Sequence, residues 1–174
     1  MSKKFKTIDI VYIGLFSALI AVCAWISIPL TVSITLQTMA VCITAGLLGW
    51  KRGTLSICVY ILLGMIGLPI FTGFKSGPSA VTGPTGGYIV GFIFTSIIIG
   101  FACQKLKNRI FTNALVMAFG ILVCYLFGTV WFMIAYKVTF VSALSTCVIP
   151  FLIPDAVKIA LAATLVNRLK KFVK

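Results

Sequence analysis

The sequence predicts an all-α membrane protein with six transmembrane helices and both termini in the cytoplasm. Its composition is the first observation: 61% of the 174 residues are hydrophobic and only 10% are charged. This composition is more apolar and less charged than that of a soluble domain, which could not bury so many apolar side chains. The second observation is that the apolar residues form six runs. With no repeat or linker between them, the runs predict one domain over residues 1–174.

The six runs are separated by short segments that contain Lys, Gly or Pro, residues that interrupt an apolar helix. They span residues 7–28, 36–50, 55–70, 88–103, 114–135 and 151–166. The first run is too long for a cleavable signal peptide and lacks a small-residue cleavage site, so we expect it to remain as a helix. Several runs are shorter than the roughly 20 residues of an upright span.

The distribution of positive charge predicts the topology, because cytoplasmic loops of membrane proteins are enriched in Lys and Arg. Alternate segments carry 3, 2, 3 and 4 positive charges, and the segments between them carry 0, 1 and 1. The first set is Lys3, Lys4 and Lys6; Lys51 and Arg52; Lys105, Lys107 and Arg109; and Arg168, Lys170, Lys171 and Lys174. The second set contains only Lys75 and Lys137. This alternation requires six spans and places both termini inside.

The charge distribution of the sequence and the residue types that it lacks disfavour several function classes. The net charge of +13 lies in clusters between apolar runs, so it favours a lipid bilayer and not nucleic acid as the partner. With no His and two acidic residues, the chain lacks the groups of a catalytic triad, a carboxylate pair or a His-rich metal site. No GxxxxGK[ST] loop for ATP is present. The six cysteines are spaced singly, which predicts small buried side chains and neither metal ligands nor disulfides.

The segment 73–87, GFKSGPSAVTGPTGG, is one candidate ligand-binding region. Its five glycines and two prolines do not form a lipid-exposed helix, so the segment lies in water or lines a site. Thr85, Gly86, Gly87 and Tyr88 stand at the expected start of the fourth helix, where backbone amides can donate to a polar ligand. An ordinary flexible outer loop, with Pro84 helping to begin a helix, explains the same residues.

Asp155 and Lys158 form the second candidate region. They are three residues apart near the start of the sixth run, so they share one face of a helix. Ionisable residues within a membrane segment usually face the bundle interior or a cavity, and here they would offer an anionic solute a buried ammonium. The alternative is structural: Asp155 favours the helix N-terminus, and Lys158 extends toward the membrane surface.

The first run contains a stripe of small residues, which lets another helix approach closely. That helix belongs either to this bundle or to a separate membrane subunit, and packing within the bundle is the simpler interpretation. The stripe consists of Gly14, Ser17, Ala18, Ala21 and Ala24.

Five segments in this order resemble the BioY family, the biotin-binding S components of energy-coupling factor (ECF) transporters. The resemblance covers essentially the whole chain. The segments are TLQTMAV at 35–41, AGLLGWKRG at 45–53, YILLGMIGLPIF at 60–71, GPTGGYIVGF at 83–92 and PFLIPDAVKIALA at 150–162.

The resemblance implies the S-component fold, capture of biotin from outside the cell, and no catalytic activity or cofactor. It also implies a transmembrane coupling subunit and two cytoplasmic ATPases as partners. The small-residue stripe would then dock on the coupling subunit.

Biotin suits the candidate residues. Lys158 can pair with the carboxylate, while the ureido ring needs partners such as Asp155, Gln37, Thr85 and the amides of Gly86 and Gly87. Tyr88, Phe71 and Trp131 are candidates for the apolar walls. Which end of biotin meets Asp155 and Lys158 stays open.

Two other hypotheses remain. An S component for riboflavin or thiamin would share the architecture, although Lys158 should repel cationic thiamin. A channel would show ion flux without tight, saturable retention of a solute. An intramembrane enzyme would turn over a substrate.

Overall fold

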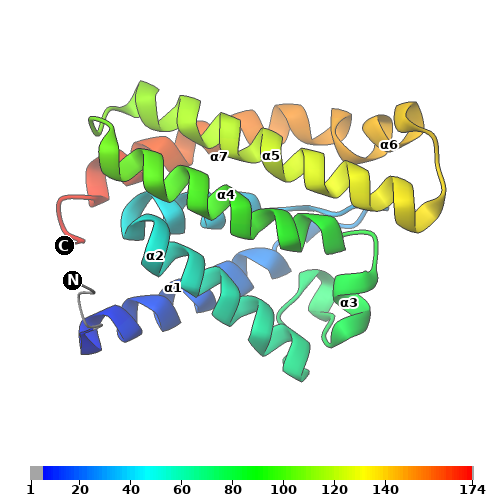
Figure 1. The fold of residues 1–174 in the computed structure, drawn as a ribbon, viewed down its shortest axis with the longest axis horizontal. Helices are drawn as coiled ribbons and strands as arrows, with labels where there is room; N and C mark the ends of the chain where they lie inside the picture. Colours follow the sequence, from blue (N-terminus) through cyan, green and yellow to red (C-terminus); the bar gives the residue numbers. More distant parts are fainter. Residues whose placement is uncertain (1–5, 174) are drawn as a thin grey trace.

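The computed structural model describes residues 6–173 as a bundle of helices with one two-stranded hairpin, which confirms the predicted all-α class (Figure 1). β1 and β2 pair antiparallel, with Ser27 opposite Thr35. In chain order the elements are α1 (Thr7–Trp25), β1 (Ser27–Ile28), β2 (Ile34–Thr35), α2 (Gln37–Ile66), the 3-10 turn η1 (Thr72–Phe74), α3 (Pro78–Thr82), α4 (Gly86–Lys105), α5 (Ile110–Tyr136), α6 (Phe140–Cys147) and α7 (Ile149–Leu169).

Within residues 6–173, four helical segments are long and apolar enough to cross a membrane: Thr7–Trp25, Gly86–Lys105, Ile110–Tyr136 and Phe140–Leu169. Large apolar side chains on their outer faces are exposed, as expected for surfaces that contact lipid. Examples are Val11 and Leu15 of α1, Leu122 of α5, and Ile153 and Val157 of α7. Further spans remain a prediction, because they depend on α2.

The helix α2 bends back on itself at Gly49. The backbone of Gly49 has φ 76° and ψ −178°, a left-handed conformation that favours glycine. The side-chain amide of Gln37 lies 3.0 Å from the hydroxyl of Tyr60. A straight helix would separate these residues by about 35 Å. The two halves of α2 therefore run antiparallel, and they correspond to the second and third apolar runs of the sequence.

The core of the bundle is formed by α2 and α4, which pack extensively against each other. α1 covers α2, α5 covers α4, and α7 packs between α2 and α5. Buried hydroxyl groups join neighbouring helices: Ser17 donates to the carbonyl of Ser56 at 2.7 Å, and Thr95 donates to that of Gly120 at 2.9 Å. All six cysteines are free thiols and five are buried, as predicted for small apolar side chains.

The basic residues gather at one end of the bundle, which we call the basic end (left in Figure 1). There Arg52, just after the Gly49 bend, pairs with Asp9 of α1 at 2.7 Å, and Lys170 donates to the carbonyl of Cys103. The described members are Lys6, Lys51, Arg52, Lys105, Lys107, Arg109, Arg168, Lys170 and Lys171. Lys3, Lys4 and Lys174 lie outside the described residues. The segments that follow η1 and α5, which contain Lys75 and Lys137, lie at the opposite end (Figure 1).

Three short elements were not expected from the sequence: the β1–β2 hairpin, α3 within the segment 73–87, and α6 before α7. The hairpin follows an apolar run that was expected to continue to residue 28, but α1 ends at Trp25. α6 begins at a capping threonine, Thr139, whose hydroxyl accepts a hydrogen bond from the Ser142 amide. The hairpin and α3 contribute residues to the cavity described below, whereas α6 does not.

Candidate ligand-binding site

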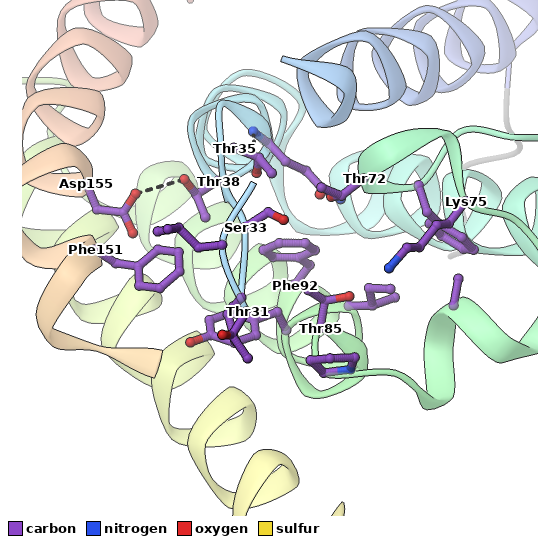
Figure 2. A pocket seen from close by; sticks show the side chains of 18 of the residues that line it. Thr31, Ser33, Thr35, Thr38, Thr72, Lys75, Thr85, Phe92, Phe151 and Asp155 are labelled. Carbon is purple, nitrogen blue, oxygen red and sulfur yellow. Dashed lines mark hydrogen bonds between the residues drawn. The ribbon is translucent and has the colours of Figure 1, made fainter. Parts of the chain in front are cut away.

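A cavity opens at the end of the bundle opposite the basic end. Residues of the β1–β2 hairpin, both halves of α2, the segment 71–75 and helices α4, α5 and α7 line it. Its empty space, counted with the open mouth, is about 800 Å³. Figure 2 shows Asp155 and Phe151 on one side of this space and Lys75 on the other.

The charged group buried most deeply among the described lining residues is the carboxylate of Asp155, which is 2% exposed. Its Oδ1 accepts from the Lys158 ammonium at 2.7 Å and from the Thr38 hydroxyl at 3.1 Å. Its Oδ2 accepts from the Tyr125 hydroxyl at 2.6 Å. Three donors from three helices thus hold one carboxylate, which offsets the cost of burying its charge.

Lys158 points into the bundle and is 7% exposed, so it does not extend to the membrane surface. Besides Asp155, its ammonium contacts the Thr38 hydroxyl at 3.4 Å, which leaves donor capacity for a ligand. Asp155 also lies beyond the first turn of α7, so a helix N-terminus does not account for its position. The pair therefore forms a neutral, hydrogen-bonded floor of the cavity.

A second polar group lies on α2. The Gln37 amide nitrogen donates to the Tyr60 hydroxyl at 3.0 Å, and that hydroxyl donates to the carbonyl of Ile70 at 3.3 Å. The carbonyl oxygen of the Gln37 side chain has no hydrogen-bond partner among the described residues, so it can accept from a ligand N–H. The bend at Gly49 brings these two residues together.

Aromatic rings form much of the remaining wall. The ring centroid of Phe151 lies 6.1 Å from that of Tyr88 and 6.4 Å from that of Tyr125. The Tyr88 hydroxyl donates its proton to the carbonyl of Cys147, so the ring of Tyr88 is held against the cavity as an apolar wall. Phe92 and Phe71 add further apolar surface. The site combines an apolar body with a few convergent polar groups, as ligand pockets do.

Comparison with known proteins identifies the family. The model of the BioY family matches residues 1–174. The chain belongs to the BioY family. It is 42% identical to "Biotin transporter BioY" of Thermotoga maritima, over 91% of this chain and 93% of that protein. It is 39% identical to "Probable biotin transporter BioY" of Pyrococcus horikoshii, over 95% of this chain and 98% of that protein.

A solved structure has the same fold. The crystal structure of the S-component for biotin from an ECF-type ABC transporter matches with a TM-score of 0.89 and 30% identity. The match covers 98% of this chain and 95% of that one. The predicted resemblance is thereby confirmed, and this BioY chain is a multi-pass membrane protein with the S-component fold.

The cavity of this BioY chain contains six of the nine substrate-binding residues predicted from the sequence: Gln37, Phe71, Thr85, Tyr88, Asp155 and Lys158. The other three, Gly86, Gly87 and Trp131, lie outside its lining. The Gly86 amide already donates to the Gly83 carbonyl at 3.0 Å, and the Trp131 indole donates to the same carbonyl at 3.1 Å. These contacts fix the turn that presents Thr85.

Gly87 lets α4 and α5 approach closely. A Cβ atom at Gly87 would lie 2.4 Å from the Cβ of Trp131 and 2.5 Å from the carbonyl oxygen of Phe127. Any larger residue there would push the two helices apart. Gly86 and Gly87 thus pack behind the cavity wall, while Thr85 and Tyr88 of the same segment line it. A contact of the two glycines with a ligand stays a prediction.

Several lining residues were missed by the sequence analysis: Thr38, Tyr60, Lys75, Tyr125 and Phe151. Tyr125 lies within a uniformly apolar run, and only the packing of α5 against α7 places its hydroxyl on Asp155. Thr38 directly follows Gln37 and bonds to Asp155 across the cavity. Neither residue has a local sequence signal.

The small-residue stripe of α1 divides between two surfaces. Ser17, Ala21 and Ala24 are buried inside the bundle, where Ser17 bonds to α2. Gly14 and Ala18 are exposed, and a Cβ atom at Gly14 would meet nothing within 4 Å. Packing within the bundle therefore accounts for three residues, and docking of a partner remains a prediction for Gly14 and Ala18.

Proposed function

We propose that this chain is the biotin-binding S component of an ECF-type vitamin uptake transporter. The observation that carries the proposal is the Asp155–Lys158 pair, buried and hydrogen-bonded at the floor of a partly aromatic cavity. The curated relatives are named biotin transporters, and the matching solved structure is a biotin S-component. The chain acts as a binding and transport subunit and not as an enzyme.

The chemistry of biotin matches the polar groups of the cavity. The ureido ring has two N–H donors and one carbonyl acceptor. The free carbonyl oxygen of Gln37 and the Asp155 carboxylate can accept these N–H groups, and the remaining ammonium proton of Lys158 can donate to the carbonyl. The sulfur-containing ring and the methylene chain suit the walls made by Tyr88, Phe92 and Phe151.

Charge gives the orientation in the membrane. We place the basic end in the cytoplasm, because positive charge is retained on that side, so the cavity opens to the outside. With the two halves of α2 counted as separate spans, six spans carry the chain from a cytoplasmic N-terminus to a cytoplasmic C-terminus. Residues 1–174 then form one transmembrane domain that captures biotin from outside.

Transport also requires an energy source. Since the sequence has no GxxxxGK[ST] loop, we assign ATP binding to two cytoplasmic ATPase subunits and mechanical coupling to a transmembrane subunit. The exposed apolar face around Gly14 and Ala18 of α1 is the docking surface that we assign to the coupling subunit.

The proposal is tested by titrating the detergent-solubilised, vitamin-free protein with biotin. Asp155→Asn and Lys158→Met should each abolish tight, saturable binding, because each leaves a buried charge without its partner. Asp9→Asn is the matched control, since it changes the sequence's other acidic residue, which is also ion-paired but lies at the basic end. It should keep biotin affinity unchanged.

Folded wild-type protein that ignores biotin but retains riboflavin or thiamin would keep the S-component architecture and refute the substrate. Equal loss of binding in Asp9→Asn would show that the variants act through stability and not through the site. Thermal unfolding of each purified variant separates these outcomes.

A further inference from the structure

Lys75 is a lining residue whose place in the site neither the sequence motifs nor the proposed function explains. It lies in the segment after η1, and its side chain extends into the cavity from the side opposite Asp155 (Figure 2). Its backbone is anchored, because the Lys75 carbonyl accepts from the Phe71 amide at 3.1 Å. Phe71 is itself buried against Gly64 and Tyr60. A fixed backbone thus presents a flexible ammonium at the mouth.

The charges around the cavity are unevenly distributed. Three charged residues line it: Asp155 and Lys158 at the floor, and Lys75 at the mouth. The sequence has only two acidic side chains, and both are already paired, Asp9 with Arg52 and Asp155 with Lys158, each at 2.7 Å. No side-chain carboxylate is therefore left for Lys75. The floor is neutral, and the one uncompensated charge among the described lining residues is the Lys75 ammonium.

This distribution suits a ligand with a neutral polar head and an anionic tail. A carboxylate placed at the floor would lie close to Asp155, and like charges at short range repel strongly where water is excluded. At the mouth the same carboxylate meets a cation that is exposed, so both groups stay partly hydrated and little desolvation opposes their pairing. Donors and acceptors of the floor remain free for the neutral head.

We propose that Lys75 binds the carboxylate of the ligand and thereby orients biotin with its ureido ring at the Asp155–Lys158 floor. The proposal rests on the proposed function, since it assumes that biotin occupies this cavity. It assigns to Lys75 the discrimination between biotin and analogues whose tail is uncharged. Lys158 then serves the head of the ligand and not its tail.

The test compares biotin with biotinamide, in which a neutral carboxamide replaces the carboxylate. Both ligands are titrated against wild type, Lys75→Gln and Lys75→Arg. Lys137→Gln is the matched control, because Lys137 is the other lysine at the same end of the bundle and does not line the cavity.

Wild type should bind biotin about tenfold or more tightly than biotinamide, the usual size of a hydrogen bond to a charged group. Lys75→Gln should weaken biotin by about that factor and leave biotinamide unchanged, so the preference disappears. Lys75→Arg should restore it, and Lys137→Gln should behave as wild type.

The inference is overturned if Lys75→Gln keeps the preference, or if it weakens both ligands equally, since the second result describes a steric and not an electrostatic role. Wild-type protein that binds neither ligand would instead refute the proposed function, and the Lys75 assignment with it. Biotin binding that is intact in wild type and unchanged in Lys75→Gln would refute the Lys75 assignment alone.

Discussion

The hydroxyl of Tyr125 should be the main neutral support of the Asp155 carboxylate. It donates to Oδ2 at 2.6 Å, whereas Lys158 and Thr38 share Oδ1. Tyr125→Phe removes that hydroxyl and keeps the ring, so the packing against Phe151 is preserved. The substitution therefore isolates one hydrogen bond to a buried carboxylate.

The expected loss follows from the type of bond. A hydrogen bond to a charged group contributes about 1.5–3 kcal/mol, and a buried oxygen left without its donor loses that contribution fully. For a chain of this size, each kcal/mol of unfolding free energy corresponds to roughly 2–4 °C in Tm, so we expect Tm to fall by about 3–12 °C. Thr38→Val removes a longer bond, at 3.1 Å, to the same carboxylate, and the oxygen concerned keeps Lys158 as a second donor. Its expected loss therefore lies at the lower end of that range, about 1.5 kcal/mol.

Thermal unfolding of the vitamin-free protein in detergent measures both losses. Tyr136→Phe is the control, because Tyr136 ends the same helix, is exposed, and has no hydroxyl hydrogen bond among the described residues. The reasoning fails if Tyr125→Phe is no more destabilising than Tyr136→Phe, or if Thr38→Val has the larger effect. Biotin should still bind to Tyr125→Phe, since Lys158 and Thr38 continue to hold Asp155.

Three further predictions concern other parts of the bundle. Asp9→Asn should lower the unfolding free energy, measured by chemical denaturation, by about 1–3 kcal/mol. This loss is smaller than for a fully buried ion pair, because the side chain of its partner Arg52 is 31% exposed. An unchanged unfolding free energy would mean that the pair is dispensable. Gly87→Ala should cost about 1–3 kcal/mol of stability, because the new methyl group would clash where α4 meets α5. Gly14→Ala has open space around it and should be neutral or stabilising. Equal melting temperatures of the two variants would contradict this contrast. In intact cells, a membrane-impermeant thiol reagent should label the Lys137→Cys variant and not the Lys171→Cys variant. The labelling of the unsubstituted chain, which has six cysteines, is the background for both. The reverse pattern would mean that the topology is inverted.

The sequence was sufficient for the helical class and for most helix positions, because composition and the length of an apolar run are local properties. The fourth to sixth runs lie within α4, α5 and α7 and fall short of their ends by up to four residues. The first run was expected to extend to residue 28, but α1 ends at Trp25 and Ile28 pairs with Ile34 in the hairpin. Such short elements depend on contacts with the cavity edge and have no period of their own.

Residues of the candidate site were predicted most directly where an ionisable side chain is rare in the sequence, although Gln37, Phe71, Thr85 and Tyr88 were also predicted and line the cavity. Asp155 and Lys158 are unusual within an apolar run, so they were identified from the sequence alone, and the structure places both at the cavity floor. Tyr125 and Thr38 are ordinary residues of apolar helices, and their importance comes from the three-dimensional contact with Asp155. Lys75 was counted as an outer-loop charge, and only the fold brings it to the cavity mouth.

A site inside a membrane protein has to keep polar groups available without leaving a charge uncompensated. The Asp155–Lys158 pair achieves this because its two charges cancel and Thr38 and Tyr125 complete the hydrogen bonding of the carboxylate. A neutral floor binds a ligand through hydrogen bonds and not through net charge, so it selects for shape and for the pattern of donors and acceptors. We propose that selection for charge is then left to the exposed mouth, where water lowers the desolvation cost of pairing and where Lys75 is the only charged residue among the described lining residues.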